Sequence, residues 1–256
     1  MNRSSPLPAE DAQEEKHVWQ RYLGRDDVSF QPGYHDNPRT DVVDRLGVVP
    51  NCVLEIGCGS GATGKLIKER FPDATVIGVE SNLQAADLAR KRMDRVYGTT
   101  FEELNADEPD FPKGRIDVAL LLDVLEHMYD PWRALVKLKT MLAPGARVLA
   151  SIPNVRNLIL MDQLAQGRWR YEATGLLDIT HIRFFTLKDM TRLFEETGFR
   201  ILNSFRLAEG SLAKIPVPLE GETIDLHTDK MVLKQLSRQD VLELTATQFI
   251  LLCEPA

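Results

Sequence analysis

The chain has 256 residues, of which 43% are hydrophobic, and it carries a formal net charge of −7 at pH 7. That charge argues against broad electrostatic attraction to nucleic acid or to an anionic membrane. No apolar run is long enough to cross a bilayer, and residues 1–16 lack the apolar core of a signal peptide. Cys52, Cys58 and Cys253 have no metal-binding or redox spacing. Cys52 and Cys253 lie in apolar, strand-like runs, so we expect them to be buried, reduced thiols, and we expect a cytoplasmic protein.

The first two thirds of the chain predict alternating strands and helices. Residues 1–33 are expected to form a polar arm and an amphipathic helix. Strands that are apolar on both faces and alternate with helices form parallel sheets. The sequence therefore predicts an α/β fold with helices on both faces of a sheet. The strands are predicted at 52–56, 74–80, 94–98, 115–122 and 146–152, and the helices at 62–71, 82–93 and 131–142.

The pattern changes after residue 153. Thr186 and Asp189 form a capping box at the start of a helix. A long gap between the last two predicted strands indicates an insertion near 207–244, and insertions of this length are often functional. Helices are predicted at 155–165, 187–197 and 229–242, and strands at 199–205 and 245–253.

A glycine-rich turn, VLEIGCGSGATGKL at residues 53–66, fits three kinds of ligand site. Gly59 to Lys65 spells most of a phosphate-binding P-loop, but Leu66 stands where a hydroxyl would hold Mg²⁺. The glycines also fit a dinucleotide fingerprint, because Glu80 ends the second strand where an acid would bind ribose hydroxyls. A site for S-adenosylmethionine (SAM) uses the same acid for the same purpose.

The residue before the turn distinguishes the last two ligands. Glu55, Gly57, Gly59 and Gly61 follow the spacing E-x-G-x-G-x-G. The Glu55 carboxylate would repel the pyrophosphate of a dinucleotide, whereas it favours the sulfonium and ammonium groups of SAM. Because glycines let the backbone approach a ligand closely, the sequence favours SAM held by these four residues and Glu80.

Three segments carry a resemblance to a known family: VLEIGCGSGATGKLIKERFPDATVIGVE, IDVALLLDVLEHMYDPWRALVKLKTMLAPGARVLASIPN and THIRFFT. Over residues 34–206 the chain resembles class I SAM-dependent methyltransferases, in particular the bacterial group related to ubiquinone-pathway O-methyltransferases. The resemblance implies a Rossmann-like, seven-stranded, mostly parallel sheet with an antiparallel last strand, in a methyltransferase domain at 34–256. It also implies O-methylation of a small-molecule, sugar or glycan hydroxyl. The alternatives are a SAM-binding protein without catalysis and an NAD(P)-linked oxidoreductase or epimerase.

The same resemblance implies further contacts with SAM. Members of the family often place an acidic residue beside the adenine after the third strand, and this chain offers Thr99, Thr100 or Glu102 there. Thr99 is the candidate that we take for the cofactor site. Tyr34 and Arg39, upstream of the first strand, are expected to close over SAM from the N-terminal side.

Polar residues after the fourth predicted strand are the catalytic candidates. Asp123, Glu126 and His127 are expected to face the SAM pocket, because ligands collect at the carboxyl ends of parallel strands. His127 is the candidate base, since its unperturbed pKa lies near neutrality, or it only orients a loop by hydrogen bonding. Asp123 is also a candidate ligand for the SAM amino group. With His181, the three resemble the metal site of small-RNA 2′-O-methyltransferases, so Mg²⁺, Mn²⁺ or Zn²⁺ is a candidate cofactor.

Residues 155–186 are expected to form a substrate lid, because GRWRYEATGLLDITHIRFF mixes arginines with aromatic residues. Arg168, Arg170, His181 and Arg183 are the candidate acceptor-binding residues, suited to a phosphorylated, acidic or sugar-bearing acceptor. The alternative is that the segment packs over the sheet edge with its two phenylalanines in the core. The expected partner is a small-molecule or glycan acceptor, and nucleic acid is not expected without a wider basic face.

Overall fold

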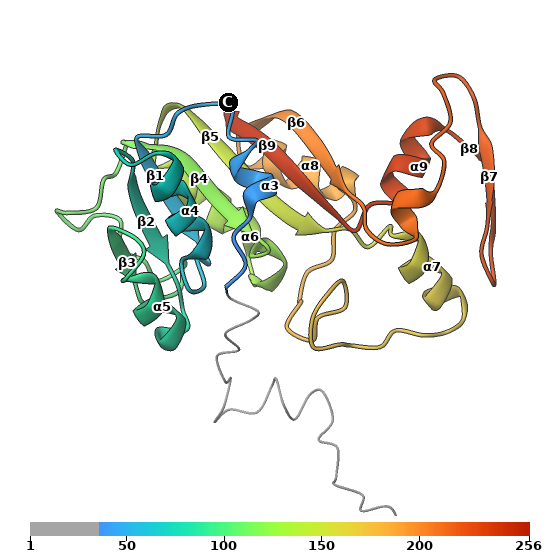
Figure 1. Ribbon diagram of the computed structural model, residues 1–256, viewed down its shortest axis with the longest axis horizontal. Coiled ribbons are helices and arrows are strands. Elements are labelled where there is room, and N and C mark those ends of the chain that lie inside the picture. The colour runs from blue at the N-terminus through green and yellow to red at the C-terminus, as the bar shows by residue number, and fades with distance from the viewer. Residues whose placement is uncertain (1–35) are drawn as a thin grey trace, which may run out of the picture.

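The computed structural model describes residues 36–256, so the predicted arm and helix of residues 1–33, and Tyr34, lie outside the described residues. A central sheet (Figure 1) consists of β1 (Cys52–Ile56), β2 (Thr75–Val79), β3 (Arg95–Tyr97), β4 (Ile116–Leu122), β5 (Leu142–Pro153), β6 (Phe199–Leu207) and β9 (Gln248–Pro255). The strand order is β3-β2-β1-β4-β5-β9-β6. The first five strands pair in parallel, whereas β9 runs antiparallel between β5 and β6. The predicted seven-stranded Rossmann-like sheet with an antiparallel last strand is therefore confirmed.

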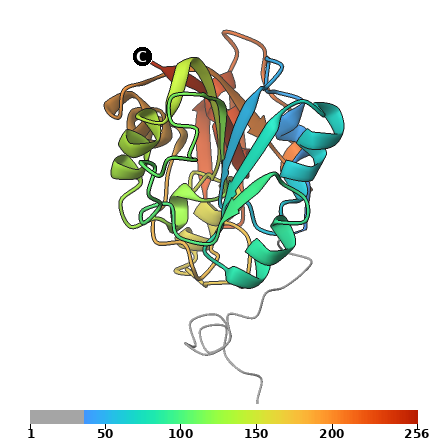
Figure 2. The same ribbon diagram turned by 90° about the vertical axis from the view of Figure 1, so that its left-hand side faces the viewer.

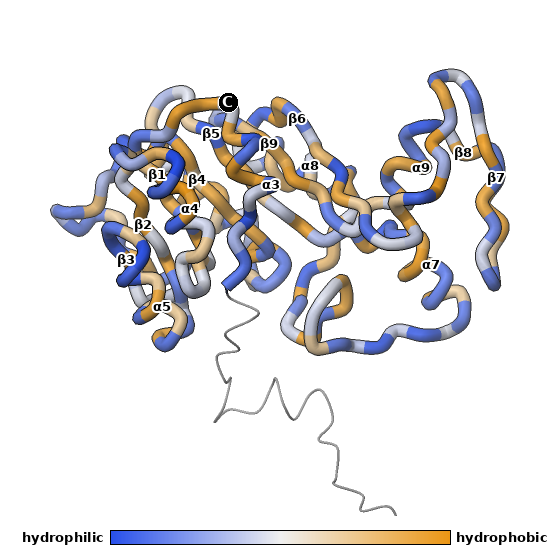
Figure 3. The backbone as a smooth tube through the Cα atoms, in the orientation of Figure 1, coloured by the Kyte–Doolittle hydropathy of each residue, from blue (hydrophilic) through white to orange (hydrophobic). Residues whose placement is uncertain are grey.

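Helices cover both faces of this sheet (Figure 2). They are α3 (Thr40–Val43), α4 (Ala62–Arg70), α5 (Leu83–Ala89), α6 (Pro131–Lys139) and α8 (Leu187–Glu196). Residues of α6 and α8 share one buried cluster with Leu54 and Ile56 of β1, whereas residues of α3 and α4 share another with Val53. Alternate residues of β1 thus enter two cores, as the period of a strand requires. The central strands β1 and β4 are mostly hydrophobic in Figure 3.

Local sequence signals set the helix starts as predicted. Pro131 occupies the first position of α6, and the Thr186 side chain caps α8 by accepting a hydrogen bond from the backbone N–H of Asp189. The predicted end of α6 is too late. Leu142 pairs with Ile116 as the first residue of β5, and strand pairing therefore ends the helix earlier than the sequence pattern does.

The predicted insertion builds a small layer of its own beside the sheet (Figure 1). It contains a short 3₁₀ helix η2 (Leu212–Lys214), a hairpin of β7 (Ile224–His227) and β8 (Val232–Leu236), and α9 (Arg238–Leu244). These elements share a buried cluster with α7 (Leu158–Ala165). The helix predicted at 229–242 is wrong in its first half. Ser237 and Asp240 form a capping box that starts α9 at Arg238, and the residues before it pair with β7.

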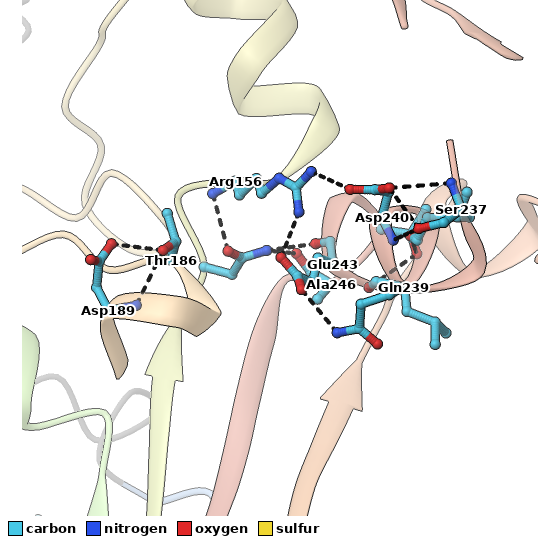
Figure 4. A network of polar contacts seen from close by, with 12 residues as sticks. Arg156, Thr186, Asp189, Ser237, Gln239, Asp240, Glu243 and Ala246 are labelled. Atoms are coloured by element: carbon cyan, nitrogen blue, oxygen red, sulfur yellow. Dashed lines mark hydrogen bonds and ion pairs between the residues drawn. The ribbon is translucent and has the colours of Figure 1, made fainter. Parts of the chain in front are cut away.

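Arg156 fastens α9 to the end of β5 (Figure 4). Its guanidinium donates to Asp240 Oδ1 at 2.7 Å and to Glu243 Oε2 at 2.5 Å. The Asn154 side chain donates to the backbone carbonyls of Glu243 and Ala246, at 2.7 and 3.1 Å. These bonds hold the inserted layer against the edge of the sheet where the parallel strands end.

The sequence expectations about membranes and cysteines can be compared with residues 36–256. No helix in this range combines the length and the apolar character that crossing a membrane requires. Cys52, Cys58 and Cys253 are buried and unpaired, as expected for thiols that belong to the two cores.

Candidate active site

The glycine turn joins β1 to α4 at the carboxyl end of the sheet. Gly57, Gly59 and Gly61 have φ angles of 68°, 53° and 78°, which glycine adopts without steric penalty. A Cβ on Gly57 would lie 2.5 Å from Cγ2 of Val124. The turn therefore requires glycine both for its backbone conformation and for the close approach of the residue after β4.

Glu80, at the end of β2, is held against this turn. Its Oε2 accepts a hydrogen bond from the Gly59 N–H at 2.8 Å, and its Oε1 accepts one from the Asn82 N–H at 2.8 Å. A carboxylate oxygen has two lone pairs, so each oxygen keeps one acceptor site for a ligand hydroxyl. These two backbone donors thus hold the Glu80 side chain at the end of β2 and fix its direction.

A cavity of about 230 Å³ lies in front of the turn at the carboxyl ends of β1 and β2. Of the residues predicted to form the site, Gly57, Glu80, Thr99 and His127 line it. Thr100 and Glu102, the other two candidates for the adenine side, line it as well. The structure thus brings the end of β2, the segment after β3 and the turn after β4 to one cavity, which Gly59, Gly61 and Asp123 do not line.

Glu55 lies beneath the turn rather than on the cavity wall. Glu55 is only 3% exposed, and its Oε2 has no hydrogen-bond partner among the described residues. Burial raises the pKa of Glu55 to about 8, and the nearby Glu80 carboxylate adds to the rise. The Thr63 hydroxyl and the Gly64 backbone act in the opposite direction. A pKa of about 8 favours the neutral acid form of Glu55 at neutral pH.

Asp123 follows β4 in a left-handed conformation, with φ 57°, which is uncommon for a residue other than glycine. Its Oδ1 accepts hydrogen bonds from Ser151 Oγ at 2.7 Å and Gln248 Nε2 at 2.8 Å. Its Oδ2 accepts one from Arg39 Nη1 at 2.8 Å. The backbone N–H of Arg39 also donates to the Thr63 hydroxyl at 3.2 Å, so the segment before α3 is tied to the glycine turn and to β4.

Glu126, His127 and His181 form a cluster whose ligating atoms all lie within 4.8 Å of one another. Glu126 and His127 belong to a 3₁₀ turn, η1 (Leu125–His127), and His181 comes from the loop before α8. Glu126 is 1% exposed, and neither carboxylate oxygen has a hydrogen-bond partner among the described residues. Burial, with the charge of Asp123 as the next cause, raises the pKa of Glu126 well above its ordinary value. Asp123, the fourth predicted metal ligand, is not part of this cluster.

Both histidines are oriented by backbone carbonyls. His127 Nδ1 lies 3.2 Å from the carbonyl oxygen of Thr180, and His181 Nδ1 lies 3.2 Å from that of Leu176. Because a carbonyl oxygen only accepts hydrogen bonds, Nδ1 of each ring is the donor, and in a neutral ring of this tautomer the lone pair lies on Nε2. His181 Nε2 is 3.9 Å from Glu126 Oε1. Burial, with His181 as the second cause, lowers the pKa of His127.

A family model described as a methyltransferase domain matches residues 29–204. The chain belongs to this family. The class I SAM-dependent methyltransferase identified from the sequence is thus confirmed, and SAM is the cofactor of this methyltransferase. The P-loop and dinucleotide interpretations of the glycine turn are set aside.

Similar proteins differ in the atom that they methylate. The chain is 27% identical to the ubiquinone biosynthesis O-methyltransferase of Aeromonas salmonicida, over 67% of this chain and 74% of that protein. It is 31% identical to the trans-aconitate 2-methyltransferase of Rhodopseudomonas palustris over 56% of each, so it spans about half of that relative. A 1,6-didemethyltoxoflavin-N1-methyltransferase from Burkholderia thailandensis, solved with S-adenosylhomocysteine, shares the fold. Its TM-score is 0.52 at 18% identity, over 99% of this chain and 93% of that one.

The arginines of the predicted lid do not lie together in this methyltransferase. The Arg183 guanidinium donates through Nε to the Tyr129 carbonyl at 3.1 Å and lies 5.3 Å from the centroid of the Tyr129 ring. Arg168 and Arg170 are exposed and do not line the SAM cavity. Of the two phenylalanines that the alternative interpretation placed in the core, Phe185 is buried there, whereas Phe184 is half-buried and packs edge to face on Trp169. His181 therefore lies beside Glu126 and His127 and not beside the lid arginines.

Sequence reasoning missed the residues that hold the catalytic candidates in place. Ser151 and Gln248 position Asp123, and Asp178 accepts a hydrogen bond from the Thr180 hydroxyl at 2.6 Å beside His127. The D-x-T-H sequence at residues 178–181 is a local signal that could have identified the last contact. Gln248 offers no such signal, because its contact depends on β9 folding back next to β5.

Proposed function

We propose that this protein transfers the methyl group of SAM to a hydroxyl of a small molecule, a sugar or a glycan. The observation that supports the proposal is the position of His127, which lines the SAM cavity while its Nδ1 faces the Thr180 carbonyl, so that the neutral ring has its lone pair on Nε2. A group of this kind can accept the proton of an attacking hydroxyl. The lowered pKa of His127 keeps it in the neutral form at neutral pH.

In the proposed reaction, the acceptor oxygen attacks the methyl carbon of SAM in line with the carbon–sulfur bond. That bond breaks and its electrons remain on sulfur, which gives S-adenosylhomocysteine. The acceptor proton passes to Nε2 of His127. The remainder of the protein contributes by holding donor and acceptor in line.

The residues around the cavity suit the parts of SAM. The free acceptor sites of the Glu80 oxygens match the two ribose hydroxyls, and Thr99 and Glu102 stand where the adenine would lie. Gly57 and Val124, which lie close together because Gly57 has no side chain, both line this cavity. Asp123 is the candidate partner of the SAM amino group, and Arg39 beside it can pair with the SAM carboxylate.

The cluster of Glu126, His127 and His181 also fits a divalent cation. Neither oxygen of its buried carboxyl has a hydrogen-bond partner within residues 36–256. Backbone carbonyls hold Nδ1 of both imidazoles and leave Nε2 for a metal, an arrangement common among metal-binding histidines. A bound ion would lower the pKa of the acceptor hydroxyl. The base role and the ligand role exclude one another, because the single lone pair of His127 cannot serve both.

Calorimetric titration of the protein with SAM and with NADH, followed by a methyl-transfer assay, tests the proposal. We expect SAM to bind and NADH not to bind, and we expect S-adenosylhomocysteine to form only when an acceptor is present. Binding of SAM without any methyl transfer to hydroxyl acceptors would leave the non-catalytic alternative. Preferential binding of NADH would contradict the proposal altogether.

A further inference from the structure

A second cavity, of about 400 Å³, lies outside the SAM site. Its walls come from α7, from the loop at residues 172–177 and from the chain at 209–212 that begins the insertion. None of the roles described above involves this space. It is larger than the SAM cavity described above and is formed by segments that lie outside the parallel strands of the sheet.

Direct contacts connect this cavity to the cluster beside SAM. His127 lines the SAM cavity, and its ring centroid lies 4.7 Å from that of His181. His181 donates to the carbonyl of Leu176, and Leu176 lines the second cavity. On another wall, Thr247 precedes Gln248, which donates to Asp123. One chain of contacts, through Leu176 and His181, therefore joins the wall of the second cavity to His127, and another, through Gln248, joins it to Asp123.

The charges on the wall of the second cavity are negative only. Glu172 and Glu209 line it, and no lysine, arginine or histidine is among its lining residues. Both glutamates are exposed, and neither carboxylate has a hydrogen-bond or ion-pair partner within residues 36–256. Two free carboxylates accept hydrogen bonds from hydroxyl and ammonium groups and repel phosphate and carboxylate groups.

The rest of the wall is divided between polar and apolar side chains. Asn157 and Ser211 line the cavity together with Leu160, Leu177 and Leu212. This mixture matches a molecule with hydroxyl groups on its rim and an apolar face, which describes a sugar ring. The wall does not match the phosphorylated or acidic acceptor that the lid arginines suggested, because Arg168 and Arg170 do not line this cavity either.

We propose that this cavity binds the methyl acceptor and that the acceptor is a neutral or amino-bearing sugar unit without an anionic group. The inference rests on the proposed function, since it names the substrate class of the same site. Glu172 and Glu209 are its specificity-determining residues. One unit charge at hydrogen-bond range in water changes affinity by about fivefold, so we expect the pair to disfavour an anionic sugar by about tenfold or more.

Saturation-transfer NMR on the full chain with S-adenosylhomocysteine present tests this inference with three probes. They are methyl β-glucoside, glucosamine and glucose 6-phosphate. We expect the first two to bind at least tenfold more tightly than the phosphate. The double variant Glu172→Gln/Glu209→Gln keeps the side-chain shapes and removes both charges. In this variant the difference in affinity between the first two probes and glucose 6-phosphate should shrink to about threefold or less. Glu220→Gln, an exposed change in the same insertion, is the matched control and should leave the difference unchanged.

Two results would overturn the inference. One is binding of glucose 6-phosphate as tight as that of the other probes in the native chain, and the other is binding of none of the three at millimolar concentration. An unchanged preference in the double variant would also contradict the assigned role of the two glutamates. Failure of the proposed function is distinguishable, because it would appear as absent SAM binding in a separate calorimetric titration.

Discussion

The imidazole rings of His127 and His181 meet edge to face, with their centroids 4.7 Å apart. One ring belongs to the turn after β4 and the other to the loop before α8. Both rings donate Nδ1–H to backbone carbonyls, and the buried Glu126 carboxyl beside them has no hydrogen-bond partner in the described part of the chain. An unsatisfied buried carboxyl is costly, so this arrangement indicates a site built for a ligand or a proton rather than for stability.

The first prediction concerns Glu80 and the cofactor. Glu80→Ala should weaken SAM binding by about 1–3 kcal/mol, the range for loss of hydrogen bonds to a charged group. Isothermal titration calorimetry measures the change. Glu69→Ala, which alters an exposed carboxylate on α4, is the control and should bind SAM like the native chain. Equal SAM affinities of the native chain and of both variants would show that Glu80 does not bind the cofactor.

The second prediction concerns Glu55 and pH. Burial raises the pKa of Glu55 in the folded state to about 8, from an ordinary value of 4.5. Its contribution to stability is therefore complete below about pH 4.5 and is lost as the pH rises through about 8. Without ligand, the part of the free energy of unfolding due to Glu55 should fall by about 3–5 kcal/mol over this interval.

Glu55→Gln is the variant that checks the pH effect. Urea unfolding at several pH values between 5 and 8 should show a smaller decline of stability for the variant than for the native chain. The same experiment on Glu69→Gln should reproduce the native decline, because that side chain is exposed. Parallel curves for native and Glu55→Gln protein would show that the buried carboxyl is not the source of the decline.

The third prediction concerns the segment before α3. Arg39→Met should reduce the free energy of unfolding by about 1–3 kcal/mol, because Asp123 loses a charged hydrogen bond at 2.8 Å. The Arg39 side chain is 15% exposed. Arg192→Met removes a comparable pair whose arginine is 72% exposed, and it should change stability by less than about 1 kcal/mol. Equal urea midpoints for the two variants would contradict a structural role for Arg39.

The fourth prediction concerns the divalent cation. If Glu126, His127 and His181 share an ion, protein purified without a histidine tag should contain it by elemental analysis, and Glu126→Gln or His181→Ala should lose most of it. Asp123→Asn should retain it, because Asp123 is engaged by Arg39, Ser151 and Gln248 outside the cluster. Absence of metal from the native protein, with full activity in excess EDTA, would leave His127 as the base.

Periodicity and local signals predicted the fold well because they depend on neighbouring residues. The β-branched runs, the Thr186 cap and the Pro131 start all appear in the structure. The sequence pattern did not predict the β7–β8 hairpin, because the residues of β8 also fit a helix. The capping box at Ser237 shows that the helix begins only at Arg238. Short-range sequence patterns cannot decide between such alternatives when tertiary pairing determines the result.

The candidate site was predicted as a set of residues but not as an arrangement. Glu80 and His127 reached the expected cavity because strand ends position them. The sequence did not show that Asp123 lies outside the cluster of Glu126 and His127. Its left-handed backbone and its contacts with Arg39 and Gln248 depend on distant parts of the chain. The direction in which Arg168 and Arg170 point is likewise not encoded in the composition of their loop.

The product of methyl transfer tests the central claim most directly. The protein should be incubated with SAM carrying a ¹³C-labelled methyl group and a small-molecule extract, and the label should be located by NMR. We predict a methyl group attached to oxygen, formed about 10²–10⁴-fold more slowly by His127→Ala. A label on nitrogen or carbon, or an unchanged rate in His127→Ala, would contradict the account.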